Sequence, residues 1–251
     1  MIHTLRQRLA EAQLALMLLT RLPAGRLPDP APPVAAGAWA FPLAGLAVGA
    51  LGAGVLTGAL ALGVPATLAA GLALGAQIMA TGALHEDGLA DVADGLWGGH
   101  DRARRLEIMR DSRIGSYGTL ALVLGVGLRW AALAHLAQDA ALTAAAALVG
   151  VAMLSRLGPV ALLATLPPAR GDGLGRSAAG PGRGVWVAGA LALPALLVPG
   201  ILPGVLTAAA TVGWLGRTAR ARLGGQTGDV LGAAQQLAEI TLLIALATAL
   251  A

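Results

Sequence analysis

The sequence predicts an all-α membrane protein, a polytopic helical bundle with roughly six to eight membrane segments. Two observations support this fold class. Of 251 residues, 57% are apolar and only 12% are charged, about half the usual charged share of a soluble domain, so a polar exterior cannot be built. The apolar residues also form long runs, and residues 31–84 contain no Asp, Glu, Lys, Arg or His. A lipid-facing exterior satisfies both observations.

The predicted elements follow in order along one integral membrane domain, residues 1–251. An N-terminal interfacial segment is expected at 1–33, because its helical part is amphipathic, is too short to span easily and is followed by five prolines. The uncharged run must cross twice, since each crossing takes about 20 residues. Membrane segments are expected at about 34–59, 63–84, 116–137, 141–165, 185–200, 201–216 and 231–250. Prolines interrupt 185–216, which is either a broken hairpin or one kinked helix.

The arginines predict the orientation of the chain. The loops at 85–113, 167–184 and 217–229 hold nearly all the Arg outside the N-terminus, and the intervening turns hold almost none. Arg-rich loops are typical of the cytoplasmic side. The net charge of +4 is therefore attributed to loop arginines, and no nucleic-acid partner is expected. The chain has no cysteine, which excludes disulfides and thiolate metal sites.

Acidic residues gather in one segment, 85–115, on the predicted cytoplasmic side. Asp87, Asp91 and Asp94 are spaced i, i+4, i+7 and project from one face of a helix. Three carboxylates on one face repel each other unless a cation lies among them, and Mg²⁺ prefers oxygen ligands. Glu86 is adjacent, as a ligand or a supporting group. The alternative is a solvated loop held by Arg–Glu pairs.

The second half of the segment contains Asp111 and several arginines, of which Arg105, Arg110 and Arg113 are the expected phosphate contacts. Acids that hold a metal beside arginines that bind anions favour a phosphate-bearing substrate and metal-assisted attack on a pyrophosphate. His85 precedes the acids and is either a helix-end hydrogen-bond partner or a base.

Further candidates lie elsewhere in the chain. In "GGQTGDVLGA", residues 224–233, Thr227 and Asp229 either cap the last helix or contribute to substrate binding, and Asp229 is alternatively a ligand to a metal. Arg129 and Arg156 lie within apolar segments, where a charge usually faces the bundle interior. Glu239 has the same setting and is expected to pair with an arginine.

These residues resemble the cobalamin synthase family, the adenosylcobinamide-GDP ribazoletransferases of bacteria. The matching pieces follow the family's order over nearly the whole chain: "TRLP" at 20–23, "FPLAGLAVGA" at 41–50, "TGALHEDGLADVADGLWGG" at 81–99, "RRLEIMRDSRIGSYG" at 104–118, "LSR" at 154–156 and "GGQTGDVLGA" at 224–233. The two blocks between residues 81 and 118 are long and specific.

The resemblance implies a multi-pass enzyme of the bacterial inner membrane that joins adenosylcobinamide-GDP to α-ribazole or its 5′-phosphate, releases GMP and requires Mg²⁺. With it, the expected catalytic residues are His85, Glu86 and Asp87, and the expected Mg²⁺ ligands are Asp87, Asp91, Asp94 and Asp111. The expected substrate contacts are Arg105, Arg110, Arg113, Arg156, Thr227 and Asp229. The site is expected to face the cytoplasm, and the chain is compatible with a homo-oligomer. The alternative is a membrane transporter for an anionic small molecule.

Overall fold

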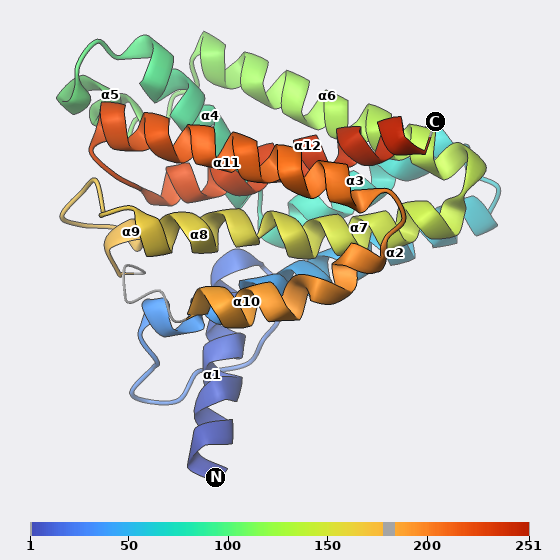
Figure 1. The fold of residues 1–251 in the computed structure, drawn as a ribbon, viewed down its shortest axis with the longest axis horizontal. Helices are drawn as coiled ribbons and strands as arrows, with labels where there is room; N and C mark the ends of the chain where they lie inside the picture. The colour runs from blue at the N-terminus through green and yellow to red at the C-terminus, as the bar shows by residue number, and fades with distance from the viewer. Residues whose placement is uncertain (1, 178–183, 251) are drawn as a thin grey trace.

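The computed structural model describes residues 2–177 and 184–250, and these form helices joined by loops, of which the longest described is residues 20–33 (Figure 1). The described part contains no β-strand; Pro168 and Gln226 form one isolated parallel bridge. The helices are α1 Ile2–Leu19, η1 Val34–Ala40, α2 Phe41–Ala61, α3 Ala66–Thr81, α4 Leu84–Gly98, α5 Arg102–Ile108, α6 Ser116–Asp139, α7 Ala141–Ser155, α8 Leu157–Thr165, α9 Leu174–Ser177, α10 Gly184–Ala192, η2 Leu193–Leu197, α11 Ile201–Leu223 and α12 Gly228–Ala249.

Four helical segments are long and apolar enough to cross a membrane: Val34–Ala61, Ser116–Gln138, Ala141–Thr165 and Gly228–Ala249. The bent pair α3 and α4 passes the same test together, which raises the number to five. The predicted all-α polytopic bundle is confirmed, with a span count just below the expected six to eight. Two predicted membrane segments are not among these spans. The 184–197 segment is too short, and the last part of α11 contains Arg217, Arg220 and Arg222, which lower the hydropathy of that helix.

Small residues allow the membrane helices to pack closely. Helix α12 lies at the centre and contacts α4, α6, α7, α8 and α11, while α2 packs along α7 and α3. A Cβ added at Gly45 of α2 would lie 2.3 Å from the Ala152 carbonyl oxygen of α7, and one at Gly49 would lie 2.7 Å from the Val149 Cα. Such contact between backbones is how helices gain packing energy within lipid.

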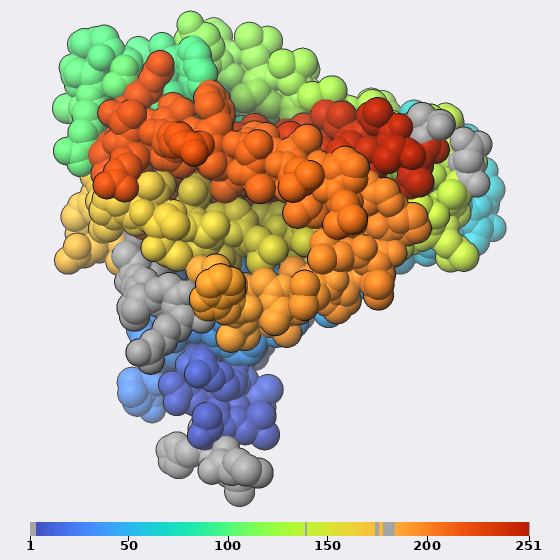
Figure 2. Space-filling view, viewed as in Figure 1, coloured from blue at the N-terminus to red at the C-terminus, as the bar shows by residue number. Residues whose placement is uncertain are grey.

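Helix α1 runs across the direction of the bundle helices and projects from one side of the molecule (Figures 1 and 2). Its buried Glu11 accepts a hydrogen bond from Trp39 Nε1 at 2.8 Å, which attaches the helix to η1, and one from Arg8 Nη1 of the same helix at 2.7 Å. This direction is the one expected of a helix that lies along a membrane surface; the interfacial location of residues 1–33 stays a prediction.

A sharp bend separates α3 from α4. The two helix axes differ by 85°, and the two residues between the helices both have positive φ, 63° at Gly82 and 57° at Ala83. The left-handed conformation ends α3 and costs about 1 kcal/mol at alanine. The Arg21 backbone N–H donates to the Ala80 carbonyl at 2.6 Å and supports the turn from the side. The bend points α4, with its acids, toward α12.

Asp94 connects the end of α4 to the start of α6. Its two carboxylate oxygens accept the backbone N–H groups of Gly115 and Gly118, at 2.7 and 2.9 Å. A Cβ at either glycine would lie 2.4 Å from an Asp94 oxygen, so the block "GSYG" must have glycine at both ends. Asp94 therefore satisfies N–H groups that the first turn of α6 leaves without helical partners.

Candidate active site

The predicted Arg-rich loops meet at one end of the bundle, on the left of Figure 1, where the α4–α5, α8–α9 and α11–α12 connections lie together. At this end α4 crosses α12 at two glycines. A Cβ on Gly88 would lie 2.7 Å from the Asp229 carbonyl oxygen, and one on Gly232 would lie 3.3 Å from the His85 Cα. The two backbones are therefore in contact, and the acids of α4 face the first turn of α12.

Three carboxylates converge at this crossing: Asp87 and Asp91 of α4 and Asp229 of α12. We call them the carboxylate cluster. Asp91 lies within electrostatic reach of Asp229, Asp87 and Asp94, and Asp229 within reach of Asp87. Asp87 is exposed and the other two are half-buried, so the cluster opens toward solvent. Negatively charged carboxylates that lie near one another repel each other and attract a cation.

The cluster is an open arrangement and not a closed cage. Within residues 2–177 and 184–250, no three His, Cys, Asp or Glu side chains already stand close enough to surround a metal ion. Carboxylate oxygens are nonetheless the ligands that Mg²⁺ prefers, and Mg²⁺ usually keeps several waters and completes its coordination with substrate phosphates, so an open set of carboxylates is enough to bind it. The donor set therefore fits this ion.

Arg170, which the sequence analysis did not single out, is the cation beside the cluster. Its Nη1 lies 3.5 Å from Asp229 Oδ2, and its Nη2 donates to the Leu106 carbonyl of α5 at 3.0 Å. Its side chain is only 16% exposed. The signal in the sequence was its position in an Arg-rich loop, but nothing in the sequence showed that this loop lies against α5 and α12.

The loop before α12 is held by both its glycines and its polar residues. A Cβ at Gly225 would lie 2.0 Å from the Pro167 carbonyl oxygen, and the Gln226 backbone exchanges hydrogen bonds with Pro167 and Ala169 at 2.9 and 2.8 Å. The Thr227 hydroxyl accepts the Val230 N–H at 3.2 Å. The capping interpretation of Thr227 is confirmed. Asp229 instead points to Thr227 Oγ1 and Arg170.

Other predicted site residues have partners away from the cluster. Asp111 pairs with Arg113 at 2.7 Å, and hydrogen bonding from Arg113 lowers the pKa of Asp111 to about 2. Arg110 pairs with Asp172 at 2.7 Å, and Arg105 donates to the His100 carbonyl at 3.3 Å. The first two pairs are exposed, as expected for a solvated loop. Their contact with substrate stays a prediction.

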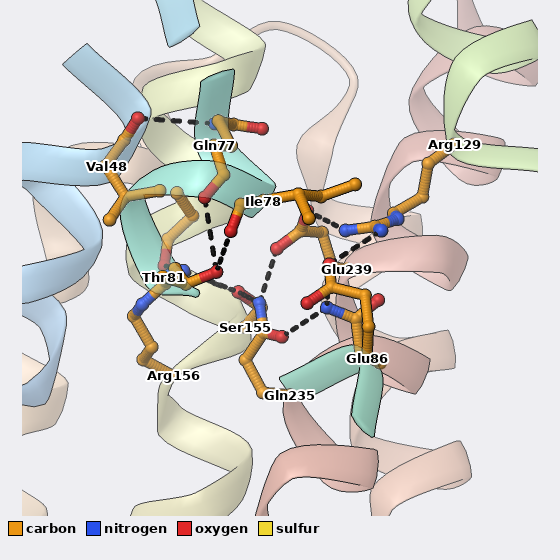
Figure 3. Close-up of polar contacts among 12 residues, drawn as sticks. Val48, Gln77, Ile78, Thr81, Glu86, Arg129, Ser155, Arg156, Gln235 and Glu239 are labelled. Carbon is orange, nitrogen blue, oxygen red and sulfur yellow. Dashed lines mark hydrogen bonds and ion pairs between the residues drawn. The ribbon is translucent and has the colours of Figure 1, made fainter. Parts of the chain in front are cut away.

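Glu86, expected among the catalytic groups, lies in a buried polar network on the inner side of α4 (Figure 3). Arg129 of α6 joins it to Glu239 of α12, with N–O distances of 2.9 Å to each carboxylate. The expectation that Glu239 pairs with an arginine is confirmed. The Arg129 side chain is 2% exposed and each glutamate side chain 9%. Neighbouring residues Asp87 and Glu86 thus face different surroundings.

The same network contains Arg156, which was expected to contact substrate. Its Nη1 donates to the Ala152 carbonyl at 2.7 Å, and Ser155 Oγ lies 3.5 Å away. Gln235 donates to Ser155 Oγ at 3.0 Å and also bonds to Glu239. Figure 3 shows these side chains converging between the helices. The two arginines and two glutamates balance in charge, which lowers the cost of burying them.

An apolar pocket of about 180 Å³ adjoins the carboxylate cluster between α1, α2, α4, α8 and α12. Asp87, Gly228 and Asp229 line it on the side of the cluster. His85 also lines it, and its side chain is buried. The remaining walls are apolar or small: Leu18, Leu19, Phe41, Leu84, Gly88, Pro159, Leu163, Leu231 and Gly232.

Comparisons with known proteins identify relatives over nearly the whole chain. The model of the family "Cobalamin-5-phosphate synthase" matches residues 11–247. Three curated proteins named adenosylcobinamide-GDP ribazoletransferase are similar: that of Bradyrhizobium diazoefficiens at 47% identity, covering 96% of this chain and 95% of its own; that of Azorhizobium caulinodans at 49%, covering 94% of each; and that of Mesorhizobium japonicum at 44%, covering 98% and 95%. No solved structure matches the chain.

Proposed function

The chain belongs to the cobalamin-5-phosphate synthase family, and we propose that its reaction takes place at the carboxylate cluster of Asp87, Asp91 and Asp229. It is a transferase that joins adenosylcobinamide-GDP to ribazole, in agreement with the names of its relatives. Because these relatives are named as enzymes, the enzyme interpretation is preferred to the transporter interpretation. The acceptor is α-ribazole or its 5′-phosphate.

The observation that carries the proposal is the convergence of carboxylates from α4 and α12 beside Arg170. In the reaction, a ribose hydroxyl of ribazole attacks the phosphorus that remains with the corrinoid. The new P–O bond forms as the bond to the second phosphate breaks, and GMP leaves. A carboxylate of the cluster, or His85, takes the hydroxyl proton.

The cluster is proposed to hold Mg²⁺ through Asp87, Asp91 and Asp229, with Asp229 in place of the Asp94 and Asp111 first expected. Both Asp94 oxygens already accept N–H groups of α6, and Asp111 is paired with Arg113. When bound, Mg²⁺ neutralises charge on the pyrophosphate and on the leaving GMP. Arg170 is placed to contact the same phosphates, since its guanidinium already lies beside Asp229.

Arg102 supports this geometry without belonging to the cluster. Its Nε donates to the Leu223 carbonyl at 2.7 Å and its Nη2 to the Ala169 carbonyl at 2.8 Å. It therefore connects α5 to the end of α11 and to the loop that carries Arg170. A fixed loop presents the arginine at a constant position relative to the cluster.

The enzyme is proposed to lie in the bacterial inner membrane with this end of the bundle facing the cytoplasm. The support is the grouping of the Arg-rich loops at the end that carries the cluster (Figure 1), which is the asymmetry expected of cytoplasmic loops. Both substrates would then reach the cluster from the cytoplasm.

A reconstituted assay tests the proposed function. Purified protein in detergent is expected to release GMP when adenosylcobinamide-GDP, α-ribazole and Mg²⁺ are all present, and to stop when excess EDTA is added. Restoring Mg²⁺ should restore release, whereas Ca²⁺, which tolerates looser coordination, should restore much less. Full GMP release in EDTA, measured by chromatography, would exclude the metal from the mechanism.

A further inference from the structure

We propose that the apolar pocket beside the carboxylate cluster binds the aromatic base of ribazole, and that His85 is its polar contact there. The inference rests on the proposed function and assigns one part of one substrate to one place. Ribazole consists of a dimethylbenzimidazole base and a ribose, so an apolar ring system and a set of hydroxyls must be bound side by side.

The size and the walls of the pocket fit such a base. Its volume is about 180 Å³, and an apolar protein cavity of about 150 Å³ is known to take up benzene. Side chains of Leu19, Phe41, Leu163 and Leu231 and the ring of Pro159 form the walls. Burial of the methyl groups and ring carbons of the base against these groups removes apolar surface from water, and one ring nitrogen is the only polar atom that then needs a partner.

His85 lines this pocket and also the small buried cavity around Arg129 and Arg156. The residue is 3% exposed, and its Nε2 has no hydrogen-bond partner in the described part of the chain. A buried polar nitrogen without a partner is uncommon and calls for an explanation. Dimethylbenzimidazole has one ring nitrogen that is not bonded to ribose, and this nitrogen accepts a hydrogen bond. A neutral histidine with its proton on Nε2 donates that bond once its ring turns toward the base.

The position of the pocket also favours the ribazole base over guanine and the corrinoid ring as its occupant. Asp87 and Asp229 belong both to the pocket wall and to the carboxylate cluster, so a base inside the pocket puts its ribose at the cluster. Guanine carries several polar groups that these apolar walls would leave without partners. A corrinoid ring is far larger than the pocket. The ribazole base is the group whose size, polarity and attached hydroxyls agree with the position.

Filling the pocket tests the proposal. Leu163→Trp puts an indole into the space, and Ala164→Trp, at the exposed neighbour on α8, is the matched control. In the GMP-release assay, Leu163→Trp is expected to raise the KM for α-ribazole about tenfold or more, with the KM for adenosylcobinamide-GDP unchanged. The control should leave both constants unchanged. An unchanged KM for α-ribazole in a folded Leu163→Trp protein overturns the proposal, and a lipid chain in the pocket would give that result.

The role of His85 is tested with an acceptor analogue in which indole replaces the benzimidazole and the accepting nitrogen is absent. The wild-type enzyme is expected to prefer the natural base over the analogue by about tenfold in kcat/KM. His85→Leu is expected to lose most of this preference, as in a double-mutant cycle. Equal preference in the two proteins refutes the contact. If Leu163→Trp raises the KM for α-ribazole while Asp87→Asn keeps the wild-type rate, the pocket assignment stands and the carboxylate proposal fails.

Discussion

Replacing Asp87 by asparagine is expected to lower the rate of GMP release by about 10³-fold, the upper range for loss of one electrostatic contact in a transition state. Asparagine keeps the size of the side chain and removes its charge. Asp87 is the exposed member of the carboxylate cluster and belongs to both the cluster and the pocket wall, so no buried partner is lost. The loss should appear in kcat at saturating Mg²⁺ and substrates.

The matched control is Glu107→Gln, which removes an acid from the same segment. Glu107 is 69% exposed and pairs with Arg104 on the surface of α5, and such pairs contribute little. Its rate should remain within twofold of wild type. Thermal unfolding in detergent establishes that both variants are folded. A folded Asp87→Asn enzyme with the wild-type rate would remove Asp87 from the mechanism.

Replacing Arg129 by methionine is expected to have the largest effect on stability. The change leaves Glu86 and Glu239 without their shared cation inside the bundle. Breaking a buried ion pair by removing one partner costs about 3–5 kcal/mol in the free energy of unfolding. The shift is measured as a lower midpoint of thermal unfolding in detergent. Because Glu86 adjoins Asp87, the rate of GMP release should fall as well.

Two further variants separate lost charge balance from lost packing. Arg104→Met removes an arginine from an exposed pair, and its effect should stay under about 1 kcal/mol. The double variant Arg129→Met, Glu239→Gln keeps one buried arginine, Arg156, and one buried glutamate, Glu86, so the buried charges balance again and much of the stability should be recovered. An unfolding midpoint of Arg129→Met equal to that of wild type would mean that the ion pairs of Arg129 with Glu86 and Glu239 do not hold α4, α6 and α12 together.

Composition and charge pattern predicted much of the fold. The apolar runs located the principal spans because lipid requires long helices with few charges. The 85° bend between α3 and α4 was not predictable, since it depends on a left-handed Ala83 supported by Arg21. The sequence therefore predicted one span at 63–84 followed by a charged loop. In the structure, the acids of that segment lie on α4, a helix that packs against α12.

The sequence predicted which segment carries the candidate site, but it predicted only some of the residues that form the carboxylate cluster. The i, i+4 spacing identified Asp87 and Asp91 because it depends on one helix alone. Asp94 has the same spacing, but its partners at Gly115 and Gly118 come from the start of another helix. Asp229 belongs to the cluster, and Arg170 lies beside it, because segments distant in the sequence are in contact. The spacing of residues within one segment carries no information about such contacts.

Direct measurement of metal binding tests the central claim most closely, with Mn²⁺ in place of Mg²⁺ and its electron paramagnetic resonance spectrum as the readout. Purified wild-type enzyme with adenosylcobinamide-GDP is expected to bind Mn²⁺. The variants Asp87→Asn, Asp91→Asn and Asp229→Asn should each weaken the affinity about tenfold or more, and Asp111→Asn should not. Undiminished binding in the three cluster variants, or loss of binding in Asp111→Asn alone, would contradict the account.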